Sequence, residues 1–373
     1  MKKTILFFTF NLSTGGAEKI LTHVANTYSK SDFKVIIASA YDKILLTIDK
    51  KIDLLVLQKE IHEPKARRNI WRKMRDIIKI VSRLRLVIKK ISPDIVCSFG
   101  VRSLLVLYLA NVGFKKRIIT SERRSPYDLT LFWKYASKFL YSRCEGVVFQ
   151  LEEARNFYSK KICQKSWVIP NPYLSKVEYP EISSFERSEI ISSGAARLEY
   201  DKGFDVLIDA FSIVHEKHPN LYLIIFGDGN IEKMYGEQIR KYNLVEYISF
   251  PGVVQNVVEE IYKTSLFVLP SRNEGIPNIL LEVMGAGVPV VASDCKPGGP
   301  RLLTNNGERG ILVEVGNSKQ MAYEICKIIE SNEISDMLSK KAREVKSVFN
   351  ENIINNMWID FLNSSIYQVK DVR

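Results

Sequence analysis

The sequence predicts an α/β protein of two doubly wound, Rossmann-like domains, each with its own parallel sheet. A chain of 373 residues is longer than one ordinary core needs, so about two domains are expected. Short runs of β-branched and aromatic residues alternate with segments of helical periodicity, which is typical of strand–helix–strand crossovers. The hydrophobic fraction of 46% and the charged fraction of 26% belong to a globular protein and exclude a disordered or collagen-like chain.

Two series of expected strands divide the chain. The first lies at residues 4–10, 34–40, 54–58, 94–99, 117–121 and 146–150, and the second at 190–196, 221–226, 248–251, 266–269, 288–292 and 311–313. The first series ends at 167–173, where two prolines break any helix or ladder. We therefore predict an N-terminal domain at 1–172, a C-terminal domain at 186–350 and a final helical segment at 351–373.

Charge and cysteine usage narrow the choice of partners. The net charge of +12 comes from the first half of the chain, whereas the rest carries a slight acidic excess. A basic first domain predicts a polyanion or an anionic membrane as its partner. The five cysteines lie far apart and form no Cys-x-x-Cys pair, so neither a disulfide framework nor a zinc site is expected. No apolar run approaches the roughly 20 residues of a membrane-spanning helix, and the N-terminal run is too short for a signal peptide, so we expect a cytoplasmic protein.

The most informative motif follows the expected strand at 266–269. Glu274 and Gly275 lie in the next loop, and Pro277 suits the first position of a helix because its missing N–H costs nothing there. The backbone amides that follow would form an anion site at the helix N-terminus, at Asn278, Ile279 and Leu280. Glu282 lies roughly 7–8 Å beyond Pro277 at 1.5 Å per residue. Carboxylates suit sugar hydroxyls rather than phosphate; the alternative is that both glutamates are solvated surface charges.

Two other strand-to-helix loops carry weaker signals. Arg197 and Lys202 are two cations around a strand end that could clamp a diphosphate, with surface solvation as the alternative. Gly15 and Gly16 follow the first strand, where glycine lets backbone amides approach a ligand at a helix N-terminus. Neither loop is a Gly-x-Gly-x-x-Gly or a P-loop, so ordinary dinucleotide or triphosphate binding is not indicated.

Taken in order along the chain, these motifs resemble the retaining nucleotide-sugar glycosyltransferases of family 4. The resemblance rests on Gly-Gly-Ala-Glu after the first strand, Gly-Ala-Ala-Arg-x4-Lys-Gly from residue 194, Phe-Gly-Asp-Gly at 226–229 and Glu-x7-Glu from residue 274. It includes Val-Ile-Pro-Asn-Pro at the domain junction and covers nearly the whole chain. The sequence looks most similar to bacterial members that extend polyprenyl-diphosphate-linked oligosaccharides, capsular repeat units or O-antigen.

The resemblance implies a GT-B architecture, with the donor bound to the C-terminal domain and the acceptor to the N-terminal domain across a cleft. Arg197 and Lys202 would hold the donor diphosphate, helped by Gly15, Gly16 and the amides after Pro277. The last helix would cross back onto the first domain.

The resemblance also implies a reaction. Glu274 would accept hydroxyls of the transferred sugar and act with the two cations in catalysis, whereas Glu282 would accept those of the ribose. Such enzymes transfer with retention, by same-face attack in which the leaving phosphate takes the acceptor proton. They need no metal and no cofactor, and the absence of an Asp-x-Asp sequence fits this expectation.

The sequence departs from the family pattern at two places. Many relatives carry a histidine near the cleft in the first domain, but Ser121-Glu-Arg-Arg-Ser-Pro126 stands at that strand end here. Glu122 or Arg123 could contact the acceptor sugar instead, with an acceptor-loop salt bridge as the alternative. Leu302 stands where many members have a glutamate, which leaves the role of the Gly298-Gly-Pro300 turn open.

Three functions remain to be compared. The first is transfer of a hexose or N-acetylhexosamine from a nucleotide-sugar, UDP-linked by preference, to a lipid-linked glycan. The second is a GT-B-shaped sugar-nucleotide epimerase, whose chemistry needs acids and histidines that the cleft lacks. The third is a non-catalytic scaffold that binds a membrane. The base, the sugar, the acceptor, the linkage and the oligomeric state are not readable from the residues.

The basic stretch Lys65–Lys90 predicts where a membrane would bind. Its cations stand beside one expected apolar stripe that consists of Trp71, Met74, Ile77, Ile78, Val81, Leu84 and Ile88. A crossover helix with solvated lysines and arginines is the alternative reading. A tryptophan among long basic side chains suits a membrane interface, whereas no aromatic platform supports nucleic acid. We expect a peripheral enzyme of the cytoplasmic membrane face.

Overall fold

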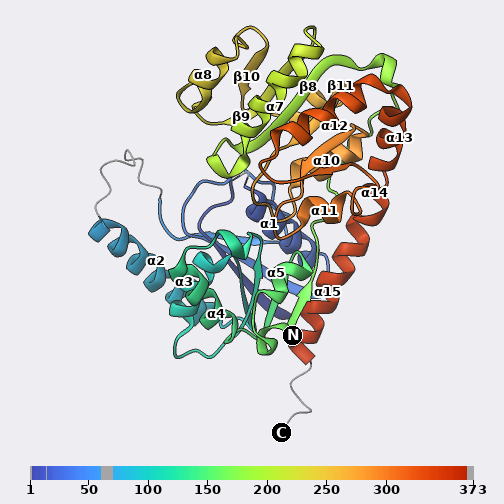
Figure 1. The fold of residues 1–373 in the computed structure, drawn as a ribbon. Helices are drawn as coiled ribbons and strands as arrows, with labels where there is room; N and C mark the ends of the chain where they lie inside the picture. The colour runs from blue at the N-terminus through green and yellow to red at the C-terminus, as the bar shows by residue number, and fades with distance from the viewer. Residues whose placement is uncertain (1, 14, 60–69, 368–373) are drawn as a thin grey trace. The chain divides into compact units, whose positions relative to one another are not determined.

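A computed structural model describes residues 2–13, 15–59 and 70–367 of the chain. The chain divides into two compact units, each with a parallel sheet of its own. The first unit runs to Pro170 and takes up the chain again from Asn352, and the second runs from Asn171 to Glu351 (Figure 1).

The first unit is built on a seven-stranded sheet of order β3-β2-β1-β4-β5-β6-β7. Its strands are β1 (Lys3–Thr9), β2 (Phe33–Ser39), β3 (Asp53–Val56), β4 (Ile95–Phe99), β5 (Arg117–Glu122), β6 (Gly146–Phe149) and β7 (Ser166–Val168). Its helices are α1 (Gly16–Ser29), α2 (Ile70–Ile91), α3 (Val101–Asn111), α4 (Leu131–Tyr141), α5 (Glu152–Asn156), α6 (Lys160–Cys163) and α15 (Glu351–Tyr367). The central strands β1 and β4 are mostly apolar and buried because helices cover both faces of a parallel sheet.

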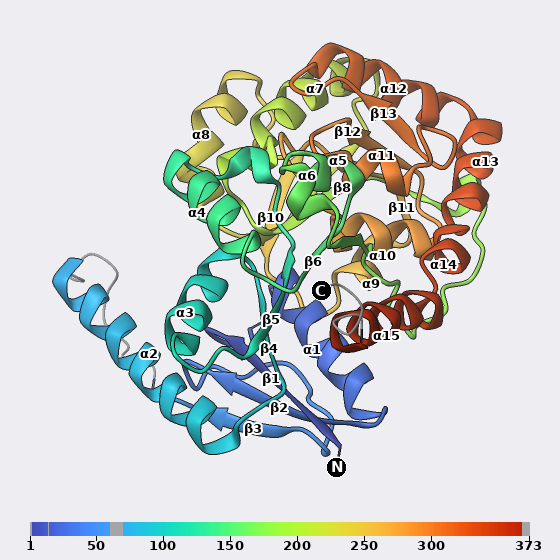
Figure 2. The ribbon, with the colours of Figure 1, turned by 90° about the horizontal axis from the view of Figure 1, so that it is seen from below.

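The helix α15 completes the core of the first unit. It lies beside α1 on one face of the sheet, whereas α2 and α3 cover the other face (Figure 2). The hydroxyl of Tyr28 donates to the carbonyl of Trp358 at 2.8 Å, and the indole of Trp358 stacks on Phe99. Trp358 is fully buried, so the last helix is held by packing as well as by hydrogen bonds.

The second unit is built on a six-stranded sheet of order β10-β9-β8-β11-β12-β13. Its strands are β8 (Ser188–Arg197), β9 (Tyr222–Asp228), β10 (Ile248–Gly252), β11 (Thr264–Leu269), β12 (Val290–Ser293) and β13 (Ile311–Val313). Its helices are α7 (Phe204–Lys217), α8 (Ile231–Lys241), α9 (Val257–Ile261), α10 (Asn278–Ala286), α11 (Gly299–Leu303), α12 (Ser318–Glu330), α13 (Asn332–Ala342) and α14 (Val345–Val348), with a 3-10 turn η4 (Tyr200–Lys202) ahead of α7. The helix α12 returns to pack beside α7, and the core lies between these helices and the sheet.

The expected fold class is confirmed, and every expected strand is present with its ends shifted by at most two residues. One prediction was wrong: the segment at 167–173 was expected only to end the first series, but Ser166–Val168 forms the edge strand β7, paired with β6. The prolines come just after the ladder and therefore do not interrupt it. Within the described ranges, no helix combines the length and the apolar character needed to cross a bilayer.

Candidate active site

The carboxyl edge of the second sheet is where a ligand is expected. All pairings in this sheet are parallel, so the strand ends that precede the helices lie along one edge. After β8 the chain continues to β9 on one side of the sheet, and after β11 it continues to β12 on the other side. The neighbouring strands β8 and β11 therefore form the switch point of the sheet. Ligands of doubly wound folds bind in the crevice at such a point.

An ion pair joins the two loops at this switch point. The Lys202 Nζ lies 2.7 Å from Glu274 Oε1, and their side chains are only 17% and 16% exposed. The Ser271 hydroxyl donates to the same Glu274 oxygen at 3.0 Å. Burial alone would lower the pKa of Lys202, but the charge and the hydrogen bond of Glu274 outweigh it and raise that pKa above its usual value. The structure thus brings together two of the residues that the sequence assigned to one site.

Arg272 straps the same two loops together. Its guanidinium donates to both carboxylate oxygens of Asp205, at 2.8 and 2.7 Å, and to the carbonyl of Tyr200 at 2.9 Å. The guanidinium also lies over the Tyr200 ring, and the Arg272 amide donates to the Asp201 carbonyl at 2.8 Å. The turn η4, which carries Lys202, is therefore tied to the loop that carries Glu274.

Two glycines allow the loop after β11 to pack tightly on both sides. Gly203 has a φ of +70°, and a Cβ atom there would overlap the carbonyl oxygen of Pro270. A Cβ atom on Gly299 would overlap the carbonyl oxygen of Gly275. The close approach to Gly275 gives the Gly298-Gly-Pro300 turn a structural role that the sequence left open.

The N-terminus of α10 presents backbone amides at the same edge. Pro277 is the N-cap of α10 rather than its first residue, so the helix begins one residue later than expected, at Asn278. The first bond of the helix runs from the Leu281 amide to the Pro277 carbonyl, so the preceding amides have no partner within the helix, at Asn278, Ile279 and Leu280. The Asn171 side chain donates to Asn278 Oδ1 at 2.6 Å and to the Ile276 carbonyl at 3.3 Å, which fixes the start of the helix.

Glu282 lies on the second turn of α10 and is partly buried. Two phenols stand near it, those of Tyr173 and Tyr179. Burial raises the pKa of both phenols, and the Glu282 carboxylate adds to the effect.

Arg197 is placed differently from Lys202. It ends β8, its side chain is largely exposed, and its guanidinium lies 3.5 Å from Glu199. Its positive charge acts against that of Lys202 and tends to lower the pKa of the lysine. Both cations therefore act at the same strand end, although Arg197 is the more solvated.

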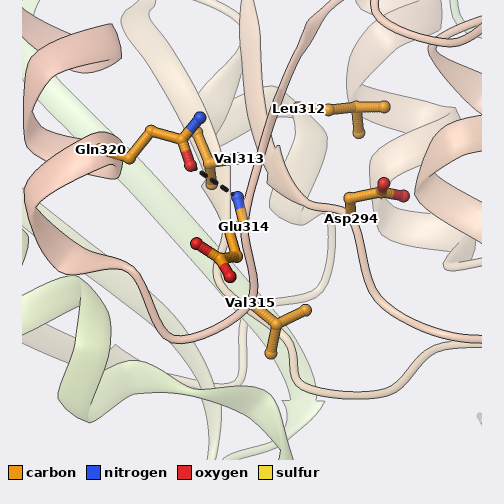
Figure 3. Close-up of a pocket in the computed structure, with 6 residues that line it drawn as sticks. All are labelled: Asp294, Leu312, Val313, Glu314, Val315 and Gln320. Atoms are coloured by element: carbon orange, nitrogen blue, oxygen red, sulfur yellow. Dashed lines mark hydrogen bonds between the residues drawn. The ribbon is translucent and has the colours of Figure 1, made fainter.

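A pocket of about 530 Å³ opens further along this edge, at the ends of β12 and β13. Figure 3 shows its lining, in which the Glu314 amide donates to the side-chain oxygen of Gln320 at 2.8 Å. Asp294 holds Arg301 through two bonds of 2.9 and 2.8 Å. The carboxylates of Asp294 and Glu314 make this pocket a poor site for a diphosphate.

The sequence-predicted residues of the first unit lie at the carboxyl ends of its own strands. Gly15 is the N-cap of α1 and Gly16 its first residue, directly after β1. Glu122 ends β5 and is buried, and its carboxylate accepts from the amides of Arg123 and Arg124 at 2.9 and 3.0 Å. Contact of these residues with a donor or an acceptor stays a prediction.

The side chains of Glu122 and Arg123 have structural partners in the interior. The Tyr141 hydroxyl donates to the second oxygen of Glu122. The Arg123 guanidinium lies over the rings of Phe99 and Trp358 and donates to the Ile169 carbonyl at 3.1 Å. Burial lowers the pKa of Arg123 to about 9. Glu122 and Arg123 thus belong to a buried network of backbone, hydroxyl and ring contacts, and the salt-bridge alternative stays a prediction.

Several site residues were not singled out from the sequence. Arg272, Asp205, Gly203 and Asn171 hold the loops of the site in place, and motifs read from one sequence do not mark such roles. One signal in the sequence could have found the Arg272–Asp205 pair. Arg272 follows β11, and Asp205 lies in the first turn of the helix that follows the neighbouring strand β8. Adjacent strand ends bring such a pair together.

Among the described residues, one group could offer three metal-ligand atoms, formed by His218, Cys326 and Glu330. It lies where α7 and α12 end, at the opposite edge of the sheet from the Lys202–Glu274 pair. His218 is already engaged with Glu330 at 3.0 Å. This group is therefore not part of the candidate site.

Comparison with known proteins agrees with this architecture. Residues 177–345 match the family described as Glycosyl transferases group 1. A glycosyltransferase of Haemophilus influenzae is 26% identical over 349 residues, which cover 91% of this chain and 94% of that protein. A Campylobacter jejuni α-1,4-N-acetyl-D-galactosaminyltransferase named for a diphosphate-undecaprenol substrate is 21% identical over 96% of this chain and 98% of its own length. The crystal structure of HepE from Anabaena in complex with UDP-glucose superposes with a TM-score of 0.78 at 19% identity, over 97% of this chain and 99% of that one.

Proposed function

We propose that this chain, whose residues 177–345 match the family described as Glycosyl transferases group 1 and whose fold is GT-B, is a glycosyltransferase with a specific reaction. It transfers a hexose or an N-acetylhexosamine from a UDP-sugar to a hydroxyl of a polyprenyl-diphosphate-linked glycan, with retention at the anomeric carbon. Support for the donor comes from the UDP-glucose complex of HepE, and support for the acceptor from the name of the Campylobacter enzyme.

The observation that carries the proposal is the Lys202–Glu274 pair at the switch point. A cation and a carboxylate in one largely buried site match the two parts of a nucleotide-sugar, because the diphosphate binds positive charge and the sugar hydroxyls donate to acceptors. When the donor binds, Lys202 turns to the diphosphate and Glu274 to the sugar. The amides at the start of α10 supply further donors for the diphosphate.

The proposed chemistry needs one bond to break and one to form. The bond between the anomeric carbon and the diphosphate oxygen breaks, and its electrons go to the leaving diphosphate. The acceptor hydroxyl attacks from the same face and gives its proton to the leaving phosphate oxygen. Lys202 and Arg197 stabilise the charge that builds on the diphosphate, so the reaction needs neither a metal ion nor a carboxylate base.

Glu282 is assigned to the ribose of the donor. It follows the backbone amides at the start of the same helix and is partly buried, and a carboxylate accepts hydrogen bonds from hydroxyl groups. In this assignment Glu274 binds the sugar of the donor and Glu282 binds its nucleoside.

The first unit is proposed to work at the cytoplasmic membrane face, through α2. In the described part of this helix, Ile80, Leu84 and Ile88 are buried, but Trp71 and Ile78 are exposed. The expected stripe is therefore split, because its N-terminal residues are exposed whereas Leu84 and Ile88 are buried. Lys65, Arg67 and Arg68 lie outside the described residues. Exposed cations continue along the rest of the helix, at Arg72, Arg75, Lys79, Arg83, Arg85, Lys89 and Lys90.

A thermal-shift screen across UDP-, GDP- and ADP-sugars, followed by a nucleotide-release assay, tests the proposal. A ligand at 100 times its dissociation constant stabilises the folded state by about 2.7 kcal/mol, and we expect this for UDP-sugars. Release of UDP in excess EDTA is expected to continue. Stabilisation without nucleotide release would favour the scaffold, a changed sugar without release would favour the epimerase, and loss of activity with the chelator would contradict the metal-free mechanism.

A further inference from the structure

The helix α4 exposes apolar side chains where a surface helix is normally polar. Phe132 is 66% exposed and Tyr135 71%, and Leu131 and Phe139 are also largely exposed. At about 100° per residue these four side chains fall within an arc of about 100°. A surface helix normally turns one apolar stripe inward and a polar face outward.

The opposite face of α4 already supplies its share of the core. Ser137, Leu140 and Tyr141 are buried on that side. The outward arc is therefore a second apolar face, and the fold of the first unit does not need it. Single exposed apolar residues are common, but a group of them on one surface marks an interaction site, so we expect this face to bind a partner.

Cations flank this face on both sides. Lys138 follows Tyr135 along one border, and Arg143 lies along the other with its guanidinium 3.5 Å from the centre of the Phe139 ring. The neighbouring helix α3 adds Arg102, whose guanidinium lies over Trp133. An apolar face bordered by long basic side chains is complementary to a surface of acyl chains beneath anionic headgroups.

The face continues onto the neighbouring helices. Tyr108 of α3 contacts Phe139 edge-on, and Leu109 and Val112 at the end of α3 are exposed. The helices α2, α3 and α4 pack in that order in the first unit, as Figures 1 and 2 both show. The exposed apolar residues of α2 thus belong to the same layer of helices as those of α4.

We propose that the α4 face, defined as Leu131, Phe132, Tyr135 and Phe139 with Lys138 and Arg143, inserts into the interface of an anionic lipid bilayer. This inference rests on the proposed function, because it specifies how the first unit reaches a lipid-linked acceptor. It differs from attraction through α2 alone: the cations draw the unit to the surface, and the α4 side chains enter it. Tyrosine suits this position because its ring is apolar and its hydroxyl remains wet.

Co-sedimentation with vesicles tests the inference without reference to activity. The substituted protein carries Phe132→Ser and Tyr135→Ser, and the matched control carries Phe185→Ser and Tyr323→Ser in the second unit, at residues that are 81% and 64% exposed. Vesicles of phosphatidylcholine with phosphatidylglycerol are compared with phosphatidylcholine alone, at low and high salt. We expect the α4 variant to bind the anionic vesicles about tenfold or more weakly, and the control to bind like the wild type.

The salt series separates insertion from simple attraction. Residual binding of the wild type at high salt should disappear in the α4 variant, because screening removes charge attraction but not apolar insertion. Equal binding by the α4 variant and the control would overturn the inference, as would a wild-type dimer in sedimentation velocity that the α4 substitutions dissolve. Both variants should keep UDP binding and UDP release, so failure of the proposed function would appear in those assays and not in sedimentation.

Discussion

The carbonyl oxygen of Gly275 occupies the place where a Cβ atom on Gly299 would stand. Gly275 directly follows Glu274, so any movement of this carbonyl also moves the candidate catalytic carboxylate. We predict that Gly299→Ala lowers kcat by about 10-fold to 10²-fold, because a misplacement of about 1 Å in a reacting group can cost that much.

A glycine elsewhere separates this effect from general loss of stability. Gly113 of the first unit has a φ of +88°, so Gly113→Ala is strained by its backbone but meets only the end of a flexible arginine. The strain should cost roughly 1–2 kcal/mol. With thermal unfolding measured for both variants, Gly113→Ala should keep the wild-type kcat. A stable Gly299→Ala protein with wild-type kcat would show that the contact does not position the loop.

Removal of the buried cation should damage catalysis more than removal of the exposed one. Lys202→Ala is expected to lower kcat by about 10²–10³-fold, since it removes a charge that stabilises the departing diphosphate. Arg197→Ala is expected to lower kcat less, because its largely exposed guanidinium is screened by solvent. Steady-state kinetics with Lys327→Ala, at an exposed lysine on the last turn of α12, provides the control. Wild-type turnover in both site variants would refute the donor-site assignment.

Substitution of Glu274 and substitution of Glu282 should affect different steps, transfer in the first case and UDP binding in the second. Glu274→Gln should lower transfer more than UDP binding, because Glu274 is assigned to the sugar. Glu282→Gln should weaken UDP binding itself, because Glu282 is assigned to the ribose. Calorimetry with free UDP and transfer kinetics on the same two proteins measure the contrast. The reverse order would mean that the two carboxylates have exchanged roles.

The Arg272 strap predicts a positioning effect without a ligand contact. Arg272→Ala should lower kcat by up to about 10²-fold while the Kd of UDP changes little, because the loops lose their alignment but keep their ligand groups. Arg272→Lys should restore little of the loss, because a lysine cannot hold both oxygens of Asp205 and the Tyr200 carbonyl at once. A large rise in the Kd of UDP with an unchanged kcat would instead place Arg272 in the binding site.

The fold could be predicted from the sequence because its signals are local. Buried parallel strands appear as short apolar runs, and the loops after Leu269 and Arg197 contain residue types that a diphosphate sugar needs. The short strand β7 escaped prediction because its three residues run straight into prolines. Packing details such as the Gly275–Gly299 approach depend on the tertiary path of the chain, which no local pattern records.

The surface was less predictable than the core. Helical periodicity placed Trp71 and Met74 of α2 on the same apolar stripe as Leu84, but Trp71 and Met74 are exposed whereas Leu84 is buried. A periodic stripe shows only that residues share a face, and two apolar faces on one helix cannot be told apart without the neighbouring elements. The same ambiguity hides the outward face of α4, whose inward and outward sides are both rich in apolar and aromatic residues.

The Lys202–Glu274 pair gives a prediction about pH. In the wild type, Glu274 raises the pKa of Lys202 above the usual 10.5, so the lysine stays charged at neutral pH. The stability that the pair contributes is fully present below about 10.5 and is lost only as the pH rises through the higher folded-state pKa. We therefore expect no fall in kcat from this lysine below about pH 10.

In Glu274→Gln burial still lowers the pKa of Lys202, whereas the larger compensating carboxylate is gone and only the weaker effect of Asp201 still raises it. The kcat of this variant should therefore fall at a lower pH than that of the wild type, in addition to its lower plateau. Profiles of kcat from neutral to alkaline pH, with unfolding by urea measured at the same values, separate loss of the lysine proton from loss of the fold. If the alkaline limbs of the two proteins coincide, the charge of Lys202 is not held by Glu274 and the coupling assigned to this pair is wrong.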